Sequence, residues 1–514
     1  MPQKVNLDAL VPREDFEVSD PTGASSPLTT IQIRDLEPTA FFYLVVRKPD
    51  FQRETSEWGG DKIAGFIQSF LDGDLIPALI LWQAGSQIFL IDGAHRLSAL
   101  IAWAQDDYGD GKVSRSFYAS VIPDEQLAVA DKTRRLIKQR IGSYDDHQFA
   151  IQNPEKSKAP ILERARRLAS LALQLQWVKG DSTKAEASFF KINQEAAPID
   201  KTELRLLQAR RLPNALAARA IVRSGTGHKY WSRFATPIRD EIEAQAKTIN
   251  DLLFTPALRT PIKTLDLPVA GRGYSSQTLP LVFELVNLSN DVKVDKDLKA
   301  DEDGSVTLRH LKASRAIVNR MSGTHPSSLG LHPVVYFYSA TGRYQPTAFL
   351  ALVGLIKEFE SRRLFPDFTR IRRAFEALLL DHKVLVNQTV VKFGSGLKGF
   401  GRLQGLFSHI IDELISGKST GDIIAALPKH PHFSFLQPAE FEGPRTRRDF
   451  DADTKSAVFL KEALADPLRC RFCGGLIHFN SFSIDHIVRR ADGGFGATDN
   501  GQLTHPYCNT TVKN

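Results

Sequence analysis

The chain of 514 residues contains little cysteine and no long hydrophobic run. Three cysteines cannot build a disulfide framework, so a small disulfide-stapled secreted scaffold is excluded. The longest apolar stretch, around residues 348–356, is about half as long as a membrane helix and predicts a buried helix instead. The first residues, MPQKVN, lack the apolar core of a signal peptide. We therefore expect a cytoplasmic protein without a membrane partner.

The charges of the chain are also nearly balanced. There are 66 Lys and Arg residues against 59 Asp and Glu residues, which leaves a net charge of +7. This mild excess has the sign that a polyanionic partner requires. A hydrophobic share of 42% with 24% charged residues is ordinary for a folded soluble chain and excludes extensive disorder. At about 150 residues per domain, the length predicts roughly three domains.

The sequence pattern predicts an α+β multidomain protein. Residues 1–29 predict a loosely ordered lead-in, and residues 30–210 predict a mixed α/β domain. In the latter we expect strands at 31–34, 77–82 and 88–91 and helices at 62–71 and 94–104. Residues 211–440 predict a largely helical middle with one short aromatic strand at 334–338. A final unit at 455–514 is too small for a hydrophobic core alone, and we expect loss of a metal to unfold only this tail.

All three cysteines lie in this final unit, where they form two pairs. Cys470 and Cys473 make a C-x-x-C pair, and His505 and Cys508 make an H-x-x-C pair. Tetrahedral Zn²⁺ accepts such a Cys₃His set, and the short spacing lets both members of a pair reach one ion. The alternative is three buried free cysteines beside a surface histidine. Because every cysteine belongs to a pair, the pattern favours structural zinc.

Polar residues between and just after the two pairs have the chemistry of phosphodiester cleavage. Asp485 and His486 follow a short apolar segment, Asn500 follows a glycine-rich loop, and Asn509 stands directly after Cys508. A carboxylate and a carboxamide can hold Mg²⁺ or Mn²⁺ with positions left open for phosphate oxygens and water. An imidazole can take a proton from water near neutral pH.

This arrangement resembles the HNH (ββα-metal) endonuclease family. The resemblance implies a zinc-stabilised domain in which His486 is the general base and Asp485 a metal ligand. It also implies that Asn500 braces the loop and orients the histidine, and that Asn509 is the second ligand of the catalytic metal. Two positions depart from the family pattern: His505 replaces a cysteine, and Asn509 replaces a histidine. The alternative is a zinc knuckle that binds nucleic acid without cutting it.

A second motif lies where the expected strand at 88–91 meets the expected helix at 94–104. Asp92 and Gly93 form the corner, and Arg96 follows one helical turn later. A helix N-terminus favours an anion, and the planar fork of an arginine can hold a phosphate at two points. The alternative is an ordinary strand-to-helix corner with Asp92 as the capping residue.

The neighbourhood of this corner resembles the ParB/sulfiredoxin-like (DGQQR/DGQHR-type) domain of modification-dependent restriction and phage-defence nucleases. The resemblance includes the FQR element at 51–53, Trp58, Pro77 and the segment SFFKINQ at 188–194. It implies a domain that binds or hydrolyses a nucleotide and controls a nuclease. The positions carried over are Gln52, Arg53, Asp92, Gly93, His95 and Arg96. Ala94 replaces the glutamine that usually follows Asp-Gly.

Clusters of basic residues could contact a phosphate backbone, although a solvated helix face is the simpler reading of each one. They lie in three parts of the chain: Lys132, Arg134, Arg135, Lys138 and Arg140; Arg362, Arg363, Arg370, Arg372, Arg373, Lys392, Lys398 and Arg402; and Arg445, Arg447 and Arg448.

Taken together, the sequence predicts a metal-dependent DNA endonuclease whose C-terminal HNH site is controlled by an N-terminal nucleotide-binding sensor. By family likeness, its role would be bacterial restriction or anti-phage defence. The expected cofactors are structural Zn²⁺, catalytic Mg²⁺ or Mn²⁺, and a nucleoside triphosphate; the expected partner is DNA. Two alternatives stay open. One is chiefly an NTPase that rarely nicks, and the other is a nucleotide-switched DNA-binding clamp with a structural zinc knuckle and little or no cutting.

Overall fold

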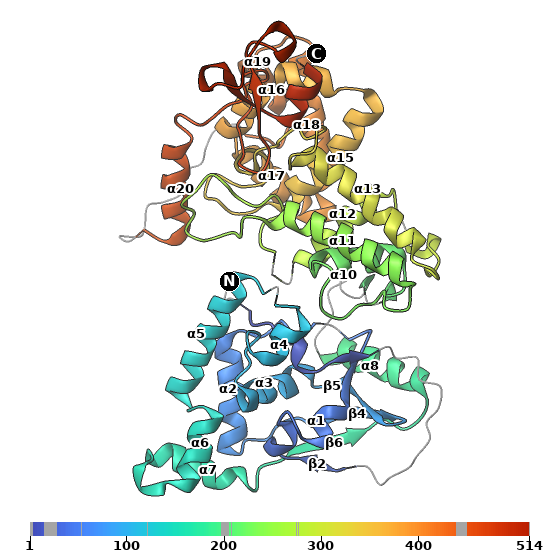
Figure 1. Ribbon diagram of the computed structural model, residues 1–514, viewed down its shortest axis with the longest axis vertical. Coiled ribbons are helices and arrows are strands. Elements are labelled where there is room, and N and C mark those ends of the chain that lie inside the picture. Colours follow the sequence, from blue (N-terminus) through green and yellow to red (C-terminus); the bar gives the residue numbers. More distant parts are fainter. Residues whose placement is uncertain are drawn as a thin grey trace. The chain divides into compact units, whose positions relative to one another are not determined.

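The computed structural model describes residues 4–14, 28–52, 54–120, 122–196, 205–206, 208–273, 275, 277–293, 295–437 and 450–512. The chain divides into two compact units (Figure 1). The first comprises Met1–Arg211, Thr226–Arg233 and Tyr274–Pro280, and the second comprises Leu212–Gly225, Phe234–Gly273 and Leu281–Asn514. Among the described residues, no helix combines the length and apolar character that crossing a membrane requires.

A mixed six-stranded sheet is the centre of the first unit, with the strand order β1-β3-β5-β4-β6-β2. β4 and β5 form an antiparallel hairpin, while β1, β3 and β5 run parallel to one another. The hairpin register pairs Leu81 with Leu90 and Trp82 with Phe89. The strands are β1 (Arg13–Glu14), β2 (Thr30–Ile31), β3 (Val46–Pro49), β4 (Leu79–Ala84), β5 (Gln87–Asp92) and β6 (Leu173–Trp177).

Both faces of this sheet are covered, as the apolar runs at 79–84 and 88–91 require. Leu79, Leu81 and Leu90 enter the larger core, which also contains residues of α2 and α3. Side chains of the opposite parity, among them Trp82 and Phe89, enter a smaller core with Ala185 and Phe189 of α8. Figure 1 accordingly shows α2 and α3 on one side of the strands and α8 on the other.

The helices of the first unit alternate with its strands along the chain. The short turns are η1 (Asp8–Leu10), η2 (Ile33–Leu36) and η3 (Pro154–Lys156). The α-helices are α1 (Phe41–Val45), α2 (Gly60–Asp72), α3 (Ala94–Gln105), α4 (Lys112–Phe117), α5 (Asp124–Arg140), α6 (Tyr144–Gln152), α7 (Ala159–Leu168) and α8 (Ser182–Ala196).

The second unit is mainly helical and ends in a small hairpin. Its helices are α10 (Pro213–Val222), α11 (Thr236–Phe254), α12 (Thr278–Ser289), α13 (Ser305–Met321), α14 (Pro333–Tyr336), α15 (Pro346–Arg362), α16 (Phe365–Asp381), α17 (Val384–Phe393), α18 (Phe400–Ile415), α19 (Thr420–Ala426) and α20 (Ala452–Ala463). The first residues of α12 are assigned to the first unit. Short turns are η4 (Asp295–Asp297), η5 (Gly396–Lys398), η6 (Leu427–Lys429), η7 (Arg490–Asp492) and η8 (Thr498–Asn500). The hairpin consists of β7 (Ser483–His486) and β8 (Gly501–Thr504), and the π-helical turn η9 (Cys508–Val512) follows it.

The mixed α+β fold is confirmed, and so is the pattern of strands and helices around the corner at Asp92 and Gly93. β4, β5, α2 and α3 lie where the strands at 77–82 and 88–91 and the helices at 62–71 and 94–104 are predicted. The expected strand at 31–34 overlaps β2 only at Ile31, and the expected strand at 334–338 is wrong. Residues 33–36 form η2, because the Asp35 carboxylate accepts the Gln32 amide at 2.7 Å and closes a turn. Residues 333–336 form α14, since Pro333 occupies the first helical position and its φ suits a helix start.

The predicted middle region and C-terminal domain belong to one compact unit in the structure. α20 illustrates this arrangement, because the Ser456 hydroxyl accepts the Ile262 amide at 3.0 Å. The expected boundary near residue 455 falls within this helix. The division of the chain into separately folding domains therefore stays a prediction.

Candidate active site and zinc centre

The four predicted zinc ligands come together. One ligand atom from each of Cys470, Cys473, His505 and Cys508 lies within 4.8 Å of the others, and all four side chains are buried. The first pair sits on a tight turn in which the Gly474 amide donates to the Cys470 carbonyl at 3.0 Å. Three sulfurs and one imidazole nitrogen at this separation match the donor set and the size of a tetrahedral Zn²⁺ site.

The orientation of His505 also suits zinc. Its Nδ1 lies 3.3 Å from Cys473 Sγ, and its Nε2 lies 3.0 Å from the Leu476 carbonyl oxygen. A hydrogen bond from Nε2 to that carbonyl leaves Nδ1 as the atom that can bind the ion. Contacts with the Cys473 and Cys508 side chains lower the pKa of the Cys470 thiol, whereas contacts with Cys470 and Cys473 raise the pKa of the Cys508 thiol.

The hairpin that follows the first cysteine pair presents the predicted catalytic residues. β7 pairs antiparallel with β8, so Asp485 lies opposite Gln502 and Ser483 lies opposite Thr504. Asp485 is only 4% exposed, and its Oδ2 accepts a hydrogen bond from Gln502 Nε2 at 2.9 Å. The sequence analysis did not predict a role for Gln502. Its position two residues after Asn500, on the strand expected to pair with that of Asp485, is the signal from which this contact could have been inferred.

Asn509 reaches the same face of the hairpin from η9. Its Nδ2 donates to Ser483 Oγ at 3.2 Å. Ser483 and Asp485 share a face of β7, because side chains two residues apart in a strand point the same way. Since Nδ2 is used in this bond, Oδ1 is the atom that Asn509 can offer to a cation. The carboxylate of Asp485 and this carboxamide oxygen fit the oxygen donors that Mg²⁺ and Mn²⁺ prefer.

His486 is the last residue of β7 and is half-buried. Its Nε2 lies 3.5 Å from Nε of Arg490, which belongs to the loop between the strands. His486 thus lies where β7 passes into the loop, and it directly follows Asp485 in the chain.

Asn500 ties the two ends of this loop together. Its Oδ1 accepts the Val488 amide at 2.7 Å, and its Nδ2 donates to the carbonyls of Val488 at 3.1 Å and Phe495 at 2.8 Å. Gly494 must be a glycine, because a Cβ there would lie 1.9 Å from the Val488 carbonyl oxygen. These contacts fix the chain immediately after His486.

The corner at Gly93 in the first unit has the predicted geometry with one correction. Gly93 itself is the N-cap of α3, with φ 99°, and Asp92 makes no capping bond. Asp92 Oδ2 instead accepts from Arg96 Nη2 at 2.7 Å, while Arg96 Nη1 donates to the Pro77 carbonyl at 2.5 Å. A Cβ at Gly93 would lie 2.4 Å from Leu79 Cδ2, so only glycine fits.

The other predicted nucleotide-binding residues surround this corner. His95 stacks on Trp58 with ring centroids 5.6 Å apart. Gln52 is buried, and its Nε2 donates to the Ile91 carbonyl at 3.3 Å. Arg53 lies outside the described residues, as do the side chains of residues 193–200.

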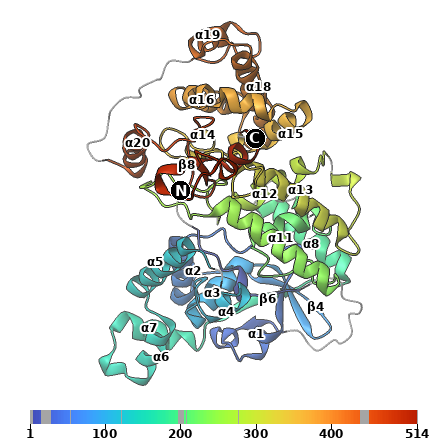
Figure 2. The same ribbon diagram turned by 45° about the horizontal axis from the view of Figure 1, so that its top comes forward.

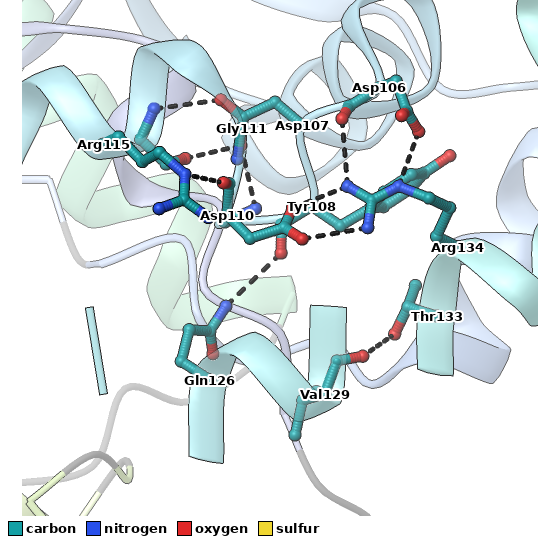
Figure 3. A network of polar contacts seen from close by, with 12 residues as sticks. Asp106, Asp107, Tyr108, Asp110, Gly111, Arg115, Gln126, Val129, Thr133 and Arg134 are labelled. Carbon is teal, nitrogen blue, oxygen red and sulfur yellow. Dashed lines mark hydrogen bonds and ion pairs between the residues drawn. The ribbon is translucent and has the colours of Figure 1, made fainter. Parts of the chain in front are cut away.

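Several of the basic residues are held by acids of the same chain. Arg134 forms ion pairs with Asp106 and Asp110 at 2.8 and 2.7 Å, in the network of Figure 3. Arg135 pairs with Asp131, and Arg140 donates to Gln68. The interpretation of Arg372 as a phosphate contact is wrong, because this side chain is 1% exposed and lies inside the second unit. Residues 445, 447 and 448 lie outside the described part of the chain.

Comparisons with known families match the two ends of the chain. A family model described as "GmrSD restriction endonuclease, N-terminal domain" matches residues 36–209. A model described as "HNH endonuclease" matches residues 470–514. No curated protein and no solved structure matches the chain significantly. These ranges confirm the two resemblances, whereas residues 210–469 are covered by neither match.

Proposed function

We propose that this chain, a hydrolytic nuclease with an HNH endonuclease domain and a restriction-type N-terminal domain, cuts DNA at the hairpin β7–β8. Endonuclease domains of these kinds imply DNA as the substrate. The observation that carries the proposal is the approach of Asn509 to Ser483 on the strand face that also bears Asp485. It supports the proposal because Asp485 and Asn509, which both carry side-chain oxygens, then lie on one side of the hairpin.

The proposed roles are to bind a divalent cation, to accept a proton, and to keep these groups in position. Asp485 and Asn509 would hold a divalent cation through Oδ oxygens, and this cation would supply charge stabilisation at the scissile phosphate and its leaving oxygen. His486 would accept a proton from the attacking water. Asn500 would keep the backbone after His486 in place through its three hydrogen bonds. Gln502 would hold the Asp485 carboxylate in one orientation.

The test of the metal site is nicking of supercoiled plasmid across a titration of Mg²⁺ and Mn²⁺. We expect Asp485→Asn to lower the cutting rate by about 100-fold or more, because a charged ligand of the cation is lost. Asp499→Asn is the matched control, since Asp499 is an exposed acid in the same loop. Wild-type cutting by Asp485→Asn at every metal concentration would contradict the assignment.

We further propose that the first unit binds a nucleoside triphosphate at the Gly93 corner and so controls cutting in restriction or anti-phage defence. The N-terminus of α3 offers backbone amides to an anion, and Arg96 stands beside it. Binding of ATP and GTP should be lost in Arg96→Ala and retained in Arg140→Ala, whose side chain lies on α5. Nucleotide binding that persists in Arg96→Ala would contradict the sensor.

The same variants separate the proposed roles of the two units. If the nucleotide site is independent of the nuclease, nucleotide turnover should survive His486→Ala and disappear in Arg96→Ala. Turnover without any cutting by wild-type protein would favour the DNA-binding clamp with a structural zinc knuckle.

A further inference from the structure

Helix α16 carries a buried ion pair that no matched family covers. Arg372 Nε donates to Glu376 Oε1 at 2.7 Å, and the two side chains are 2% and 0% exposed. Arg372 Nη2 also donates to the Gly330 carbonyl at 2.8 Å, and Nη1 donates to the Leu329 carbonyl. Burying two charges is costly unless both are well paired, so this pair must be compensated by a specific role or by its surroundings.

The partners of the pair on the other side belong to the zinc centre. Arg372 Nη1 lies 3.2 Å from His505 Nδ1. Glu376 Oε2 accepts the Leu476 backbone amide at 2.9 Å, and the Leu476 carbonyl in turn lies 3.0 Å from His505 Nε2. Glu376 thus links Arg372 to the backbone of Leu476, whose carbonyl oxygen fixes the imidazole of His505, and the Arg372 guanidinium lies beside that imidazole. Figure 2 labels α14, α16 and β8, which all belong to the second unit.

Two glycines allow the close approach of Arg372 and His505 to the neighbouring backbone. A Cβ at Gly475 would lie 2.4 Å from Arg372 Nε, and a Cβ at Gly330 would lie 2.5 Å from His505 Cδ2. The Tyr336 hydroxyl of α14 closes the network by donating to Glu376 Oε1 at 3.0 Å.

The charges of the site explain why an arginine stands there. In a Cys₃His zinc centre, the three thiolates outweigh the two positive charges of the ion, which leaves one net negative charge in a buried place. The guanidinium of Arg372 is the cation nearest the histidine ligand among the contacts described above. Glu376 fixes that guanidinium and, through Leu476, the orientation of the imidazole.

We propose that Arg372 and Glu376 are positioning residues of the zinc centre supplied by the helical region, so that zinc binding and the packing of α16 form one cooperative step. This inference requires zinc at the four ligands but does not require DNA cleavage, so it can fail or succeed independently of the proposed nuclease. It also replaces the expectation that loss of the metal unfolds only the tail.

The first test measures metal binding by the full chain. With Co²⁺ as the probe, the visible absorption bands report the ligand field, and competition with a chelator reports the Zn²⁺ affinity. Arg372→Met should shift the Co²⁺ bands and weaken Zn²⁺ binding by about 10- to 100-fold, as expected when a residue behind a metal ligand is lost. Arg373→Met is the matched control, because its exposed side chain packs over Gly474 without touching a ligand. Wild-type bands and affinity in Arg372→Met would overturn the proposal.

The second test uses the wild-type protein and remains decisive if Arg372→Met does not fold. Hydrogen exchange is followed in the zinc-loaded chain and after zinc removal by a chelator. Amides of α16 should lose protection together with those of residues 470–508, because the hydrogen bond from the Leu476 amide to Glu376 joins the two segments. Unchanged protection of α16 while the residues around the ligands exchange freely would overturn the proposal.

Discussion

At the scale of single residues, the candidate active site depends on short contacts that hold polar groups in fixed orientations. Asp485 is held by Gln502, and Asn509 is held by Ser483. Asn500 makes three hydrogen bonds across one loop. These hydrogen bonds supply positional accuracy of the kind that catalysis requires.

Gly494 and Gly496 lie in the same loop but have different surroundings, so they provide a test variant and its control. Gly494→Ala should lower the cutting rate and destabilise the hairpin, because the new Cβ would meet the Val488 carbonyl oxygen at 1.9 Å and Asn500 Nδ2 at 2.9 Å. We expect a cost of about 1–3 kcal/mol, typical of a forced backbone shift. Plasmid nicking and hydrogen exchange of the Val488 amide measure the two effects.

Gly496→Ala is the control for this prediction, because a Cβ at Gly496 meets no atom within 4 Å. It should leave both the rate and the exchange unchanged. If the two variants behave alike, the loop is not held in the described conformation during catalysis.

At the scale of secondary-structure elements, α5 shows that a basic residue of a cluster can form ion pairs within the protein. Arg134 is clamped between Asp106 and Asp110, and the hydrogen bond with Asp110 raises its pKa above the ordinary value. Figure 3 shows the guanidinium turned toward both carboxylates, with the Asp107 turn beside them. This helix is thereby fastened to the segment that follows α3.

A pair of variants in α5 tests this structural role. Arg134→Gln should lower the free energy of unfolding of the first unit by about 1–2 kcal/mol, because the mostly buried carboxylate of Asp110 loses its partner. The exposed carboxylate of Asp106 adds little to this loss. Arg135→Gln should change it by less than about 0.5 kcal/mol, since the Arg135 side chain is 79% exposed. Urea denaturation measures both values. A larger loss of DNA affinity than of stability in Arg134→Gln would instead support a phosphate contact.

Helix α13 carries a histidine that makes stability depend on pH. Burial, together with the positive charge of Arg309, lowers the pKa of His310 from 6.5 to about 4, while the negative charge of Asp301 opposes this shift. Between these two pH values the unfolded chain binds a proton that the folded chain excludes. Stability is therefore retained above pH 6.5 and decreases as the pH falls toward 4.

We expect His310 to account for about 3 kcal/mol of this loss. His310→Leu should flatten the dependence of the unfolding free energy on pH between 6.5 and 4, as measured by urea denaturation. His325→Leu, at an exposed position, should not. An unchanged slope in His310→Leu would show that this residue does not carry the effect.

At the scale of the whole molecule, the sequence was most informative where chemistry limits the choice of residues. The cluster of three cysteines and His505 could be predicted because few residue types bind zinc and because these residues occur in two short pairs. The order of β4, β5 and α3 could be predicted because apolar alternation and the Asp-Gly corner are local signals. The two family matches agree with these two regions.

The connections between distant segments could not be predicted. Arg372 reads as one more basic residue in sequence, and only the folded chain shows that its partners are Glu376 and His505. Residues 334–338 read as a strand, because the apolar run does not reveal that Pro333 begins a helical turn. Such features depend on long-range packing, which local patterns do not encode.

The central claim is that His486 is the general base of a metal-dependent DNA nuclease, and the most direct measurement is conversion of supercoiled plasmid to nicked and linear forms with Mn²⁺ present. Zinc content and Co²⁺ spectra should be equal in wild type and His486→Ala, so that any difference reports the imidazole rather than the fold. The account predicts cutting by the wild-type protein and a loss of at least about 100-fold in His486→Ala. Equal cutting by the two proteins would contradict it.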